Sequence, residues 1–447
     1  MKKYLIFSFA ALMGAMTFTA CGDDNNDKGG TGGGGETTEF DIVTTSPTVD
    51  NDTYASNTAS SYTDKSFGNA AIDGCTDLVD ELTAANAIIA SSQLSELQEA
   101  YLYAVLSNLV DNVIVPTYTN LANNVEDLEK TLSGLTTSTI TQAQIDKACE
   151  DFKAARLYWE RSEAFLMGAA SDFDIDPTID SWPLNRSLLL SYFNKGQADD
   201  EMLEDATILG FHALEFILFR DGKPRKVAEF QGKDTYKNFE NITGEQELVY
   251  AQKICTLLKQ RCFQLQVAWE GETTANASRV TVVKAAGLPY TTQNGLSYGE
   301  NLTSAGVDSK STFKTLKAAI AQVLSDDEGS CVGIANEVGT AKIANPFSAG
   351  DVSYVESPYS YNSIADFRDN IRSIRNIWLG STDKTANKYS FHTFFASVNK
   401  NNVNTDLEGT YVKAIEAISN MPAPFVKYCC TIWNIAFEDD NDWDTEE

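Results

Sequence analysis

The 447-residue sequence is poor in histidine and in positive charge, and both shortages restrict its function. It contains only two histidines, His212 and His392. Lysine and arginine number 34 against 63 aspartates and glutamates, so the formal net charge is −29. Such an acidic surface disfavours nucleic acid and anionic lipid as partners and is compatible with cations. No HExxH motif is present, so a hydrolytic zinc site would have to rely on carboxylates.

Several other motifs are missing as well. The chain has no Walker loop, no Rossmann glycine fingerprint and no GxSxG elbow. The acidic run from Asp172 to Asp176 is not an EF-hand loop, because its sixth position is Pro177 instead of glycine and its twelfth is Pro183 instead of glutamate. Strand-like alternation is scarce, which points away from an extensive sheet.

Cysteine is sparse and irregularly spaced. Apart from Cys21 there are seven cysteines and no CxxC, which argues against zinc-ribbon and thioredoxin-type sites. Seven is odd, so at least one thiol stays unpaired within one chain. Cys255 and Cys262 lie about 10 Å apart along a predicted helix and should not bond to each other. We expect most of these residues to be small buried hydrophobes.

The first forty residues predict a lipoprotein signal followed by a tether. A basic start, Met1 to Lys3, precedes an apolar run from Tyr4 to Ala15 that is too short to span a membrane. Phe18-Thr19-Ala20-Cys21 is similar to a lipobox, with Phe18 in place of the usual leucine. We expect residues 1–20 to be the signal peptide, Cys21 to be acylated and residues 21–40 to be a flexible tether. This predicts a lipid-anchored protein of a bacterial cell envelope.

After the tether, apolar residues recur at intervals of three and four, which is the spacing of helices that bury one face. The predicted helices cover residues 94–132 (with a joint at Pro116 as an alternative), 141–168, 203–219, 245–269, 312–324, 364–378, 407–419 and 424–436. Residues 271–300 are rich in Thr, Asn, Gly and Ser and predict a loop-rich connection. We therefore predict an all-α protein with two helical-bundle domains, residues 41–270 and 271–447, and a site at their interface.

The segment from Leu203 to Phe219 is the most informative part of the sequence. From Ala206 onward it is apolar or glycine except at Thr207, His212 and Glu215, which predicts a helix buried on nearly all sides. His212 and Glu215 are three apart and so lie on the same side of that helix. Each needs a partner in the protein, a metal or a ligand, because burying either one unpaired costs several kcal/mol. A satisfied polar pair in the core is the structural alternative.

Three neighbouring features extend this hypothesis. Gly210 in a helix interior indicates that another backbone or a ligand approaches closely. Glu160 and Glu163, three apart on the preceding predicted helix, are placed to face His212 across the bundle, although an ordinary solvated helix charge is their alternative. One imidazole with two or three carboxylates suits iron or manganese better than structural zinc. We predict His212, Glu215 and Glu163 as metal ligands, and no ferritin-like dinuclear centre, since only one such motif exists.

The stretch Gly210-Phe211-His212-Ala213-Leu214-Glu215 matches the GxHxxE motif of the imelysin-like proteins. Two further stretches resemble blocks of that family. The first comprises Ala155 to Phe165 and Ile179 to Pro183; the second comprises Ser357 to Ser363, Asp366, Asn370 and Trp378-Leu379-Gly380. The resemblance covers roughly residues 95–430.

The resemblance implies two helical bundles with a functional site between them. The implied site residues are Arg156, Glu160, Glu163, Asp180, Trp182, Gly210, His212, Glu215, Asn362, Ser363 and Asp366. It also implies an envelope protein of iron acquisition that binds iron or an iron-bearing ligand, with envelope iron-transport proteins as partners. Two alternatives stay open: a zinc-dependent metallopeptidase, the activity once assigned to the family, which the histidine count disfavours, and a non-catalytic scaffold whose polar cluster is purely structural.

Overall fold

The protein is described by a computed structural model over residues 41–47, 62–196, 200–326 and 329–437. The predicted signal peptide, the predicted tether and Cys21 therefore lie outside the described residues. Within these ranges helices dominate, and the sheet content is one two-stranded hairpin, β1 (Phe219–Arg220) and β2 (Lys223–Pro224). The all-α fold class is confirmed. No helix in the described ranges is both long and apolar enough to cross a membrane.

The α-helices have the following bounds. They are α2 (Ser66–Ser91), α3 (Glu96–Leu109), α4 (Val115–Leu132), α5 (Gln142–Glu160), α6 (Ala169–Asp172), α7 (Ile175–Ile179), α8 (Arg186–Asn194), α9 (Gly210–Leu218), α10 (Val227–Phe230), α11 (Gly244–Glu270), α12 (Ala277–Ala285), α13 (Tyr298–Thr303), α14 (Leu316–Leu324), α15 (Cys331–Glu337), α16 (Ser363–Leu379), α17 (Phe391–Ser397), α18 (Asn401–Ser419) and α19 (Phe425–Trp433). Two π-helical segments, Val110–Ile114 and Val338–Ala349, continue α3 and α15.

Local sequence explains several of these boundaries. The Thr141–Gln144 pair forms the predicted capping box at the start of α5, with the Thr141 backbone N–H donating to Gln144 Oε1 at 3.0 Å. Pro116 does not break the chain into two separate helices, because it lies in the first turn of α4, directly after a segment that is itself helical. The π-helical segment Val110–Ile114 joins α3 to α4 instead.

One bundle is built from α4, α5, α9 and α11, in which α4 packs against both α5 and α11, and α9 packs against α5 and α11. Buried aromatic rings hold α5 to α9, with Phe152 5.8 Å from Phe211 and 5.5 Å from Phe219 between ring centroids. These pairs add to the burial of large apolar surfaces. They fix α9, which carries the GxHxxE motif, in the centre of the bundle.

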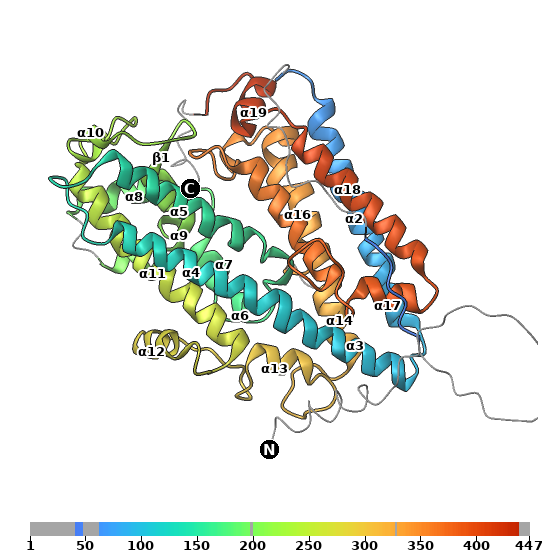
Figure 1. Cartoon of the computed structure of the whole chain (residues 1–447). Coiled ribbons are helices and arrows are strands. Elements are labelled where there is room, and N and C mark those ends of the chain that lie inside the picture. Colours follow the sequence, from blue (N-terminus) through green and yellow to red (C-terminus); the bar gives the residue numbers. More distant parts are fainter. Residues whose placement is uncertain (1–40, 48–61, 197–199, 327–328, 438–447) are drawn as a thin grey trace, which may run out of the picture.

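The second bundle contains α14, α15, α16 and α18, together with α2 from the start of the chain. Figure 1 shows α2 lying along α18, and the two helices are in extensive contact. Leu78, Leu82 and Ala85 on α2 are fully buried. Residues 66–91 thus pack with the C-terminal half, although the predicted division assigns them to the N-terminal domain; the boundary at residue 270 stays a prediction. One continuous apolar core runs through both bundles.

Two helix predictions next to the site are wrong in detail. The helix predicted from Leu203 begins only at Gly210, because Leu209 is extended and Gly210 has a φ of +71°. Residues Asp200–Glu204 and Ala206–Ile208 form 3₁₀ turns before it. Glu163 does not share a helix with Glu160, since α5 ends at Glu160 and Glu163 opens a separate 3₁₀ turn.

The cysteines behave mostly as small hydrophobic residues. The seven thiols in the described ranges are free, and all except the half-buried Cys430 are buried. Burial raises the pKa of the Cys75 thiol to about 12. Such thiols are poor nucleophiles and poor metal ligands at neutral pH. They contribute packing to the core, as expected.

Candidate functional site

The site begins where α9 meets α7. A Cβ on Gly210 would overlap the backbone carbonyl of Ile179, so only glycine allows the two segments to approach this closely. The positive φ of Gly210 also favours glycine, because other residues rarely adopt this backbone conformation. The close approach places Asp180, the residue after Ile179, beside His212 on the first turn of α9. The glycine of the motif is therefore the residue that sets the spacing of the cluster.

Glu215 ties α9 to the other bundle. Its Oε1 accepts hydrogen bonds from the backbone N–H of Tyr359 at 3.0 Å, from the backbone N–H of Ser360 at 2.7 Å and from the Ser360 hydroxyl at 2.7 Å. Its Oε2 lies 3.4 Å from His212 Nδ1. Both carboxylate oxygens are thus engaged, one in holding the turn before α16 and the other in orienting the imidazole.

His212 lies between two carboxylates. Its Nδ1 faces Glu215, and its Nε2 lies 3.2 Å from Asp180 Oδ1, within ion-pair distance. Burial and the nearby Arg156 lower the pKa of His212, but the contacts with Asp180 and Glu215 outweigh them and raise it to about 9. The imidazole is therefore positively charged at neutral pH in the metal-free protein.

Arg156, fully buried on α5, is the hub of the cluster. Its Nε lies 2.6 Å from Glu160 Oε1, its Nη1 bonds Asp180 Oδ1 and its Nη2 lies 2.5 Å from Glu356 Oε1. Asp366 Oδ2 follows at 3.8 Å from Nε. One guanidinium thus faces four carboxylates drawn from both bundles, an excess of negative charge that Arg156 alone cannot neutralise.

A second buried cation, Lys342, neutralises part of this negative charge. The Lys342 ammonium lies 3.0 Å from Glu356 Oε1, 3.7 Å from Glu337 Oε1 and 4.0 Å from Glu163 Oε1. It also sits over the Trp182 ring at 4.9 Å. Burial raises the pKa of Glu163 well above its usual value, an effect that Lys342 offsets only in part. Lys342 belongs to the π-helical segment Val338–Ala349, an irregularity that is frequent at functional sites.

The segment before and within α16 completes the cluster from the second bundle. Ser357 Oγ and Asn362 Nδ2 both donate to Asp366 at 2.5 Å, and Asn370 Nδ2 donates to Glu160 Oε2 at 2.5 Å. Ser363 Oγ donates to the backbone carbonyl of Glu356 at 2.5 Å. The structure therefore brings the predicted residues of this segment into the same network as His212, with Asp366 linked to it through Arg156.

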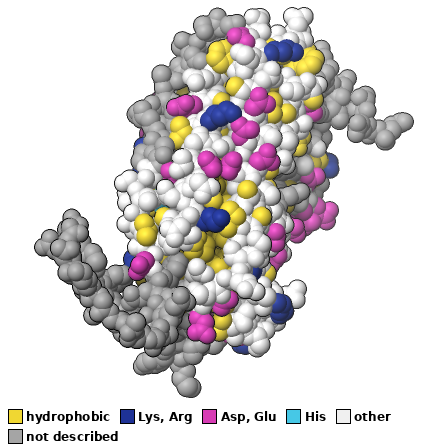
Figure 2. All heavy atoms as spheres, turned by 90° about the vertical axis from the view of Figure 1, so that its right-hand side faces the viewer, with side chains coloured by type: hydrophobic (Ala, Val, Ile, Leu, Met, Phe, Trp, Pro, Cys, Tyr) yellow, Lys and Arg dark blue, Asp and Glu magenta, His cyan; other side chains and the backbone are white. Residues whose placement is uncertain are grey.

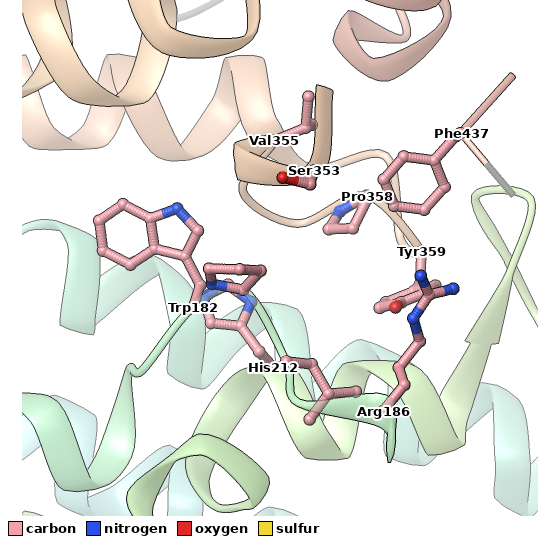
Figure 3. Close-up of a pocket in the computed structure, with 10 residues that line it drawn as sticks. Trp182, Arg186, His212, Ser353, Val355, Pro358, Tyr359 and Phe437 are labelled. Carbon is pink, nitrogen blue, oxygen red and sulfur yellow. The ribbon is translucent and has the colours of Figure 1, made fainter. Parts of the chain in front are cut away.

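A small cavity opens onto His212. Its walls are apolar and aromatic, with Trp182 on one side of His212 and Pro358 and Tyr359 on the other, as Figure 3 shows. Arg186 and Phe437 line the far end. The cavity volume of about 30 Å³ has room for about two waters or a partly hydrated ion, and is far below the volume of pockets for drug-sized ligands.

Two groups of side chains have the geometry for a metal ion. Asp180, His212 and Glu356 offer one ligand atom each within 4.8 Å of one another, and so do Glu160, Glu163 and Asp180; all five residues are buried. Three of their atoms, Glu160 Oε1, His212 Nε2 and Glu356 Oε2, are buried without a hydrogen-bond partner. Of the three predicted ligands, His212 belongs to the first group and Glu163 to the second, whereas Glu215 is engaged with the turn at Tyr359 and Ser360.

Sequence reasoning missed two residues of this cluster. Glu356 directly precedes the Ser357–Ser363 block, and that position is the only signal that could have singled it out. Lys342 lies in a segment without helical periodicity that contains Pro346, and nothing local distinguishes it from a surface lysine. Both acquire their role through contacts with Arg156, Glu163 and Trp182, which are distant in sequence.

Comparison with known proteins identifies the family of this chain. The profile of the imelysin family (Peptidase_M75) matches residues 114–438, which is well over half of the chain and contains the whole cluster. The chain belongs to the imelysin family. The matched part of this imelysin includes Arg156, Asp180, His212 and Glu356, so its family-specific region and its charged cluster coincide.

Two relatives share names that refer to iron. Iron-regulated protein A of Synechococcus elongatus is 26% identical over 275 residues, which are 62% of this chain and 64% of that protein. The crystal structure of a candidate iron-regulated protein A precursor from Parabacteroides distasonis superposes with a TM-score of 0.55 at 24% identity, covering 77% of this chain and 97% of that one. This likeness supports the helical fold.

Proposed function

We propose that this imelysin is an envelope lipoprotein of iron acquisition or homeostasis that binds iron, or a small iron-bearing ligand, between its two bundles. One observation carries the proposal: Asp180, His212 and Glu356 present three buried ligand atoms within 4.8 Å. Glu356 Oε2 lacks a hydrogen-bond partner, which is costly for a buried polar atom, and His212 Nε2 has only the Asp180 carboxylate at 3.2 Å. A cation that bound there, with release of the Nε2 proton to solvent, would remove that cost.

The donor set fits iron. One imidazole and two carboxylates are ligands that suit iron or manganese. Bound iron would supply the positive charge that the carboxylates around Arg156 lack. The chain's own residues orient the donors: Glu215 holds the His212 ring through Nδ1, and Trp159 Nε1 donates to Asp180 Oδ2 at 2.6 Å. The name of the Synechococcus elongatus relative, iron-regulated protein A, supports iron as the metal.

The metallopeptidase alternative receives little support from the same contacts. A hydrolytic metal site needs a general base beside the ligands. Glu215 is not free for that role, because both its oxygens are engaged. The carboxylates Glu160 and Glu356 face Arg156. The scaffold alternative makes a different prediction, since a purely structural cluster has no reason to bind a cation.

Anaerobic calorimetric titration with Fe²⁺ and with Mn²⁺ tests the proposal. We expect the wild-type protein to bind one ion and His212→Ala to lose binding, because the imidazole is the sole nitrogen donor of the group. His392→Ala is the matched control: His392 is also buried and lies 2.9 Å from Glu408, but belongs to α17. Absence of binding by the wild type, or equal loss in both variants, would contradict a site at His212.

The lipid anchor is part of the proposal and has its own test. Cys21→Ser should move the protein from the membrane fraction to the soluble fraction, since acyl chains attached to Cys21 would be its membrane contact. Retention of the variant in membranes would exclude this anchor. An anchored position would bring the site near envelope iron-transport proteins, which we propose as partners.

A further inference from the structure

Lys342 is the only lysine that the structure places inside the carboxylate cluster, among the described residues. Its side chain is 1% exposed, and its ammonium has three carboxylate partners, of Glu356, Glu337 and Glu163, within 4.0 Å. Glu356 is also one of the three residues grouped around His212. The ammonium thus lies next to the position that a bound metal ion would occupy.

The negative charges of the surrounding carboxylates explain why the Lys342 ammonium is buried here. Glu160, Glu163, Asp180, Glu356 and Asp366 are buried together, with Arg156 and Lys342 as their permanently charged partners. Without Lys342, Glu163 and Glu337 would lose the ammonium that lies within 4.0 Å of both. Lys342 therefore takes the place of a metal as a source of positive charge in the metal-free cluster.

The contacts of Lys342 also offer its ammonium a second position, beside Glu337. Glu356 is fully buried, whereas the Glu337 side chain is 32% exposed and lies at the end of α15, five residues before Lys342. The flexible four-carbon stem of lysine allows its ammonium to turn from one carboxylate to the other. The ammonium can then keep a carboxylate partner while it leaves Glu356.

We propose that Lys342 is an internal counter-cation of the cluster, and that an entering metal cation displaces its ammonium from Glu356 toward Glu337. This inference rests on the proposed function, because it assumes a cation at His212 and Glu356. Displacement avoids a third positive charge on one carboxylate, because Arg156 and Lys342 already share Glu356 Oε1. Lys342 thereby sets how strongly a cation must bind before it can enter the site.

Titration of Lys342→Met with Mn²⁺ measures this competition. We expect the dissociation constant to fall by at least about tenfold, because the cation no longer competes with an ammonium. Lys259→Met is the matched control, since Lys259 forms a partly buried ion pair with Glu129 at 2.5 Å on α11 and α4. It should bind Mn²⁺ as the wild type does.

Glu337→Gln identifies where the ammonium goes. In the wild-type background this variant should weaken Mn²⁺ binding, because the displaced ammonium loses its partner. In the Lys342→Met background it should have much less effect, since no ammonium has to move; the double-mutant cycle isolates this coupling. Equal weakening in both backgrounds would mean that Glu337 acts only through its charge, and would overturn the proposed route.

A measurement on the wild-type chain covers the case in which Lys342→Met does not fold. Reductive methylation followed by peptide mass spectrometry should label Lys342 faster with saturating Mn²⁺ than without it, while Lys259 labels at an unchanged rate. Unchanged labelling of Lys342 would show that the ammonium stays in place and would overturn the inference. If wild type binds Mn²⁺ but Lys342→Met binds no better, only this inference fails; if neither protein binds it, the proposed function fails.

Discussion

Two arginines buried near α9, Arg225 and Arg156, have different surroundings. Arg225 bonds both oxygens of Glu247, at 2.7 and 3.1 Å, and lies 3.1 Å from Asp234. Arg220 donates to the other oxygen of Asp234 at 2.7 Å. Glu229 Oε2 follows at 3.9 Å from Arg225 Nε. Two guanidiniums therefore face three carboxylates, and each oxygen of Glu247 and Asp234 has a hydrogen-bond donor. We refer to this group as the Arg225 cluster.

The carboxylate oxygens around Arg156 do not all have a hydrogen-bond donor. Arg156 faces four carboxylates, and buried oxygens of Glu160 and Glu356 have no hydrogen-bond donor. A cavity also reaches His212 at its edge. The comparison teaches that burial of charge does not mark a functional site by itself, since both clusters are buried. Nitrogen atoms without a hydrogen-bond partner occur in both clusters, since Arg220 Nε and Arg225 Nε have none. Surplus carboxylates, carboxylate oxygens without a donor, and access together distinguish the cluster that can accept a ligand.

The largest expected effect comes from removing either arginine. Arg225→Met and Arg156→Met should each lower the free energy of unfolding by about 3–5 kcal/mol, because a buried carboxylate loses its partner. Urea unfolding measures this loss. Added Mn²⁺ should recover stability in Arg156→Met and not in Arg225→Met, since only the first cluster has unneutralised carboxylates to bind it. Recovery in both variants, or in neither, would remove the proposed distinction between the clusters.

The two clusters should also differ in the pH range over which they affect the stability of the protein. Burial, only partly offset by Arg225, raises the pKa of Glu247 from 4.5 to about 7, whereas the pKa of His212 rises from 6.5 to about 9. A raised pKa in the folded state stabilises the protein below the unfolded pKa, and this contribution is lost as pH rises through the folded pKa. Each shift corresponds to about 3 kcal/mol.

Unfolding curves of metal-free protein between pH 4 and about 10 test this prediction. The difference between wild type and Glu247→Gln should change between pH 4.5 and about 7, and the difference between wild type and His212→Gln between pH 6.5 and about 9. Both glutamines keep a polar side chain that does not titrate. A His212→Gln difference that is flat across its interval would mean that the imidazole is neutral in the folded protein.

A smaller effect concerns the spacing of the site. Gly210→Ala should cost about 2–3 kcal/mol, because the added Cβ overlaps the Ile179 carbonyl and φ is positive. Gly134→Ala is the control: its φ is +74° but no atom lies within 4 Å of the added Cβ, so it should cost only about 1–2 kcal/mol. Mn²⁺ binding should weaken in Gly210→Ala alone, since Asp180 moves with Ile179. Equal effects in both variants would show that φ, and not spacing, matters.

The sequence predicted what depends on neighbours along the chain. The spacing of His212 and Glu215 and the apolar residues around them are local features, so the buried motif helix could be recognised. Its start could not, because the periodicity continues through Ala206–Ile208, where the extended Leu209 and the positive φ of Gly210 interrupt the helix. The sequence likewise predicts Glu163 on the same helix as Glu160, because the periodicity continues past the end of α5.

The composition of the cluster depends on contacts between bundles. Glu356 and Lys342 meet Arg156 and Glu163 across nearly 200 residues of chain, and no periodicity encodes such pairings. The role of Glu215 was open for the same reason, because its partners Tyr359 and Ser360 belong to the other half of the chain. The family resemblance supplied Asp180 and Asp366, which composition and spacing alone would not have connected to His212.

The packing of α2 on α18 has a consequence for the timing of folding. A ribosome makes α18 roughly 300 residues after α2, or about 15–60 s later at ordinary rates of synthesis. Until then the buried face of α2, with Leu78 and Leu82, has no α18 to cover it. The first bundle can assemble earlier, so His212 and Arg156 are in place before Glu356 and Lys342 arrive. Every residue of the cluster precedes α18 in the chain, so a chain that ends before α18 would contain the whole site but would leave the buried face of α2 without its main partner.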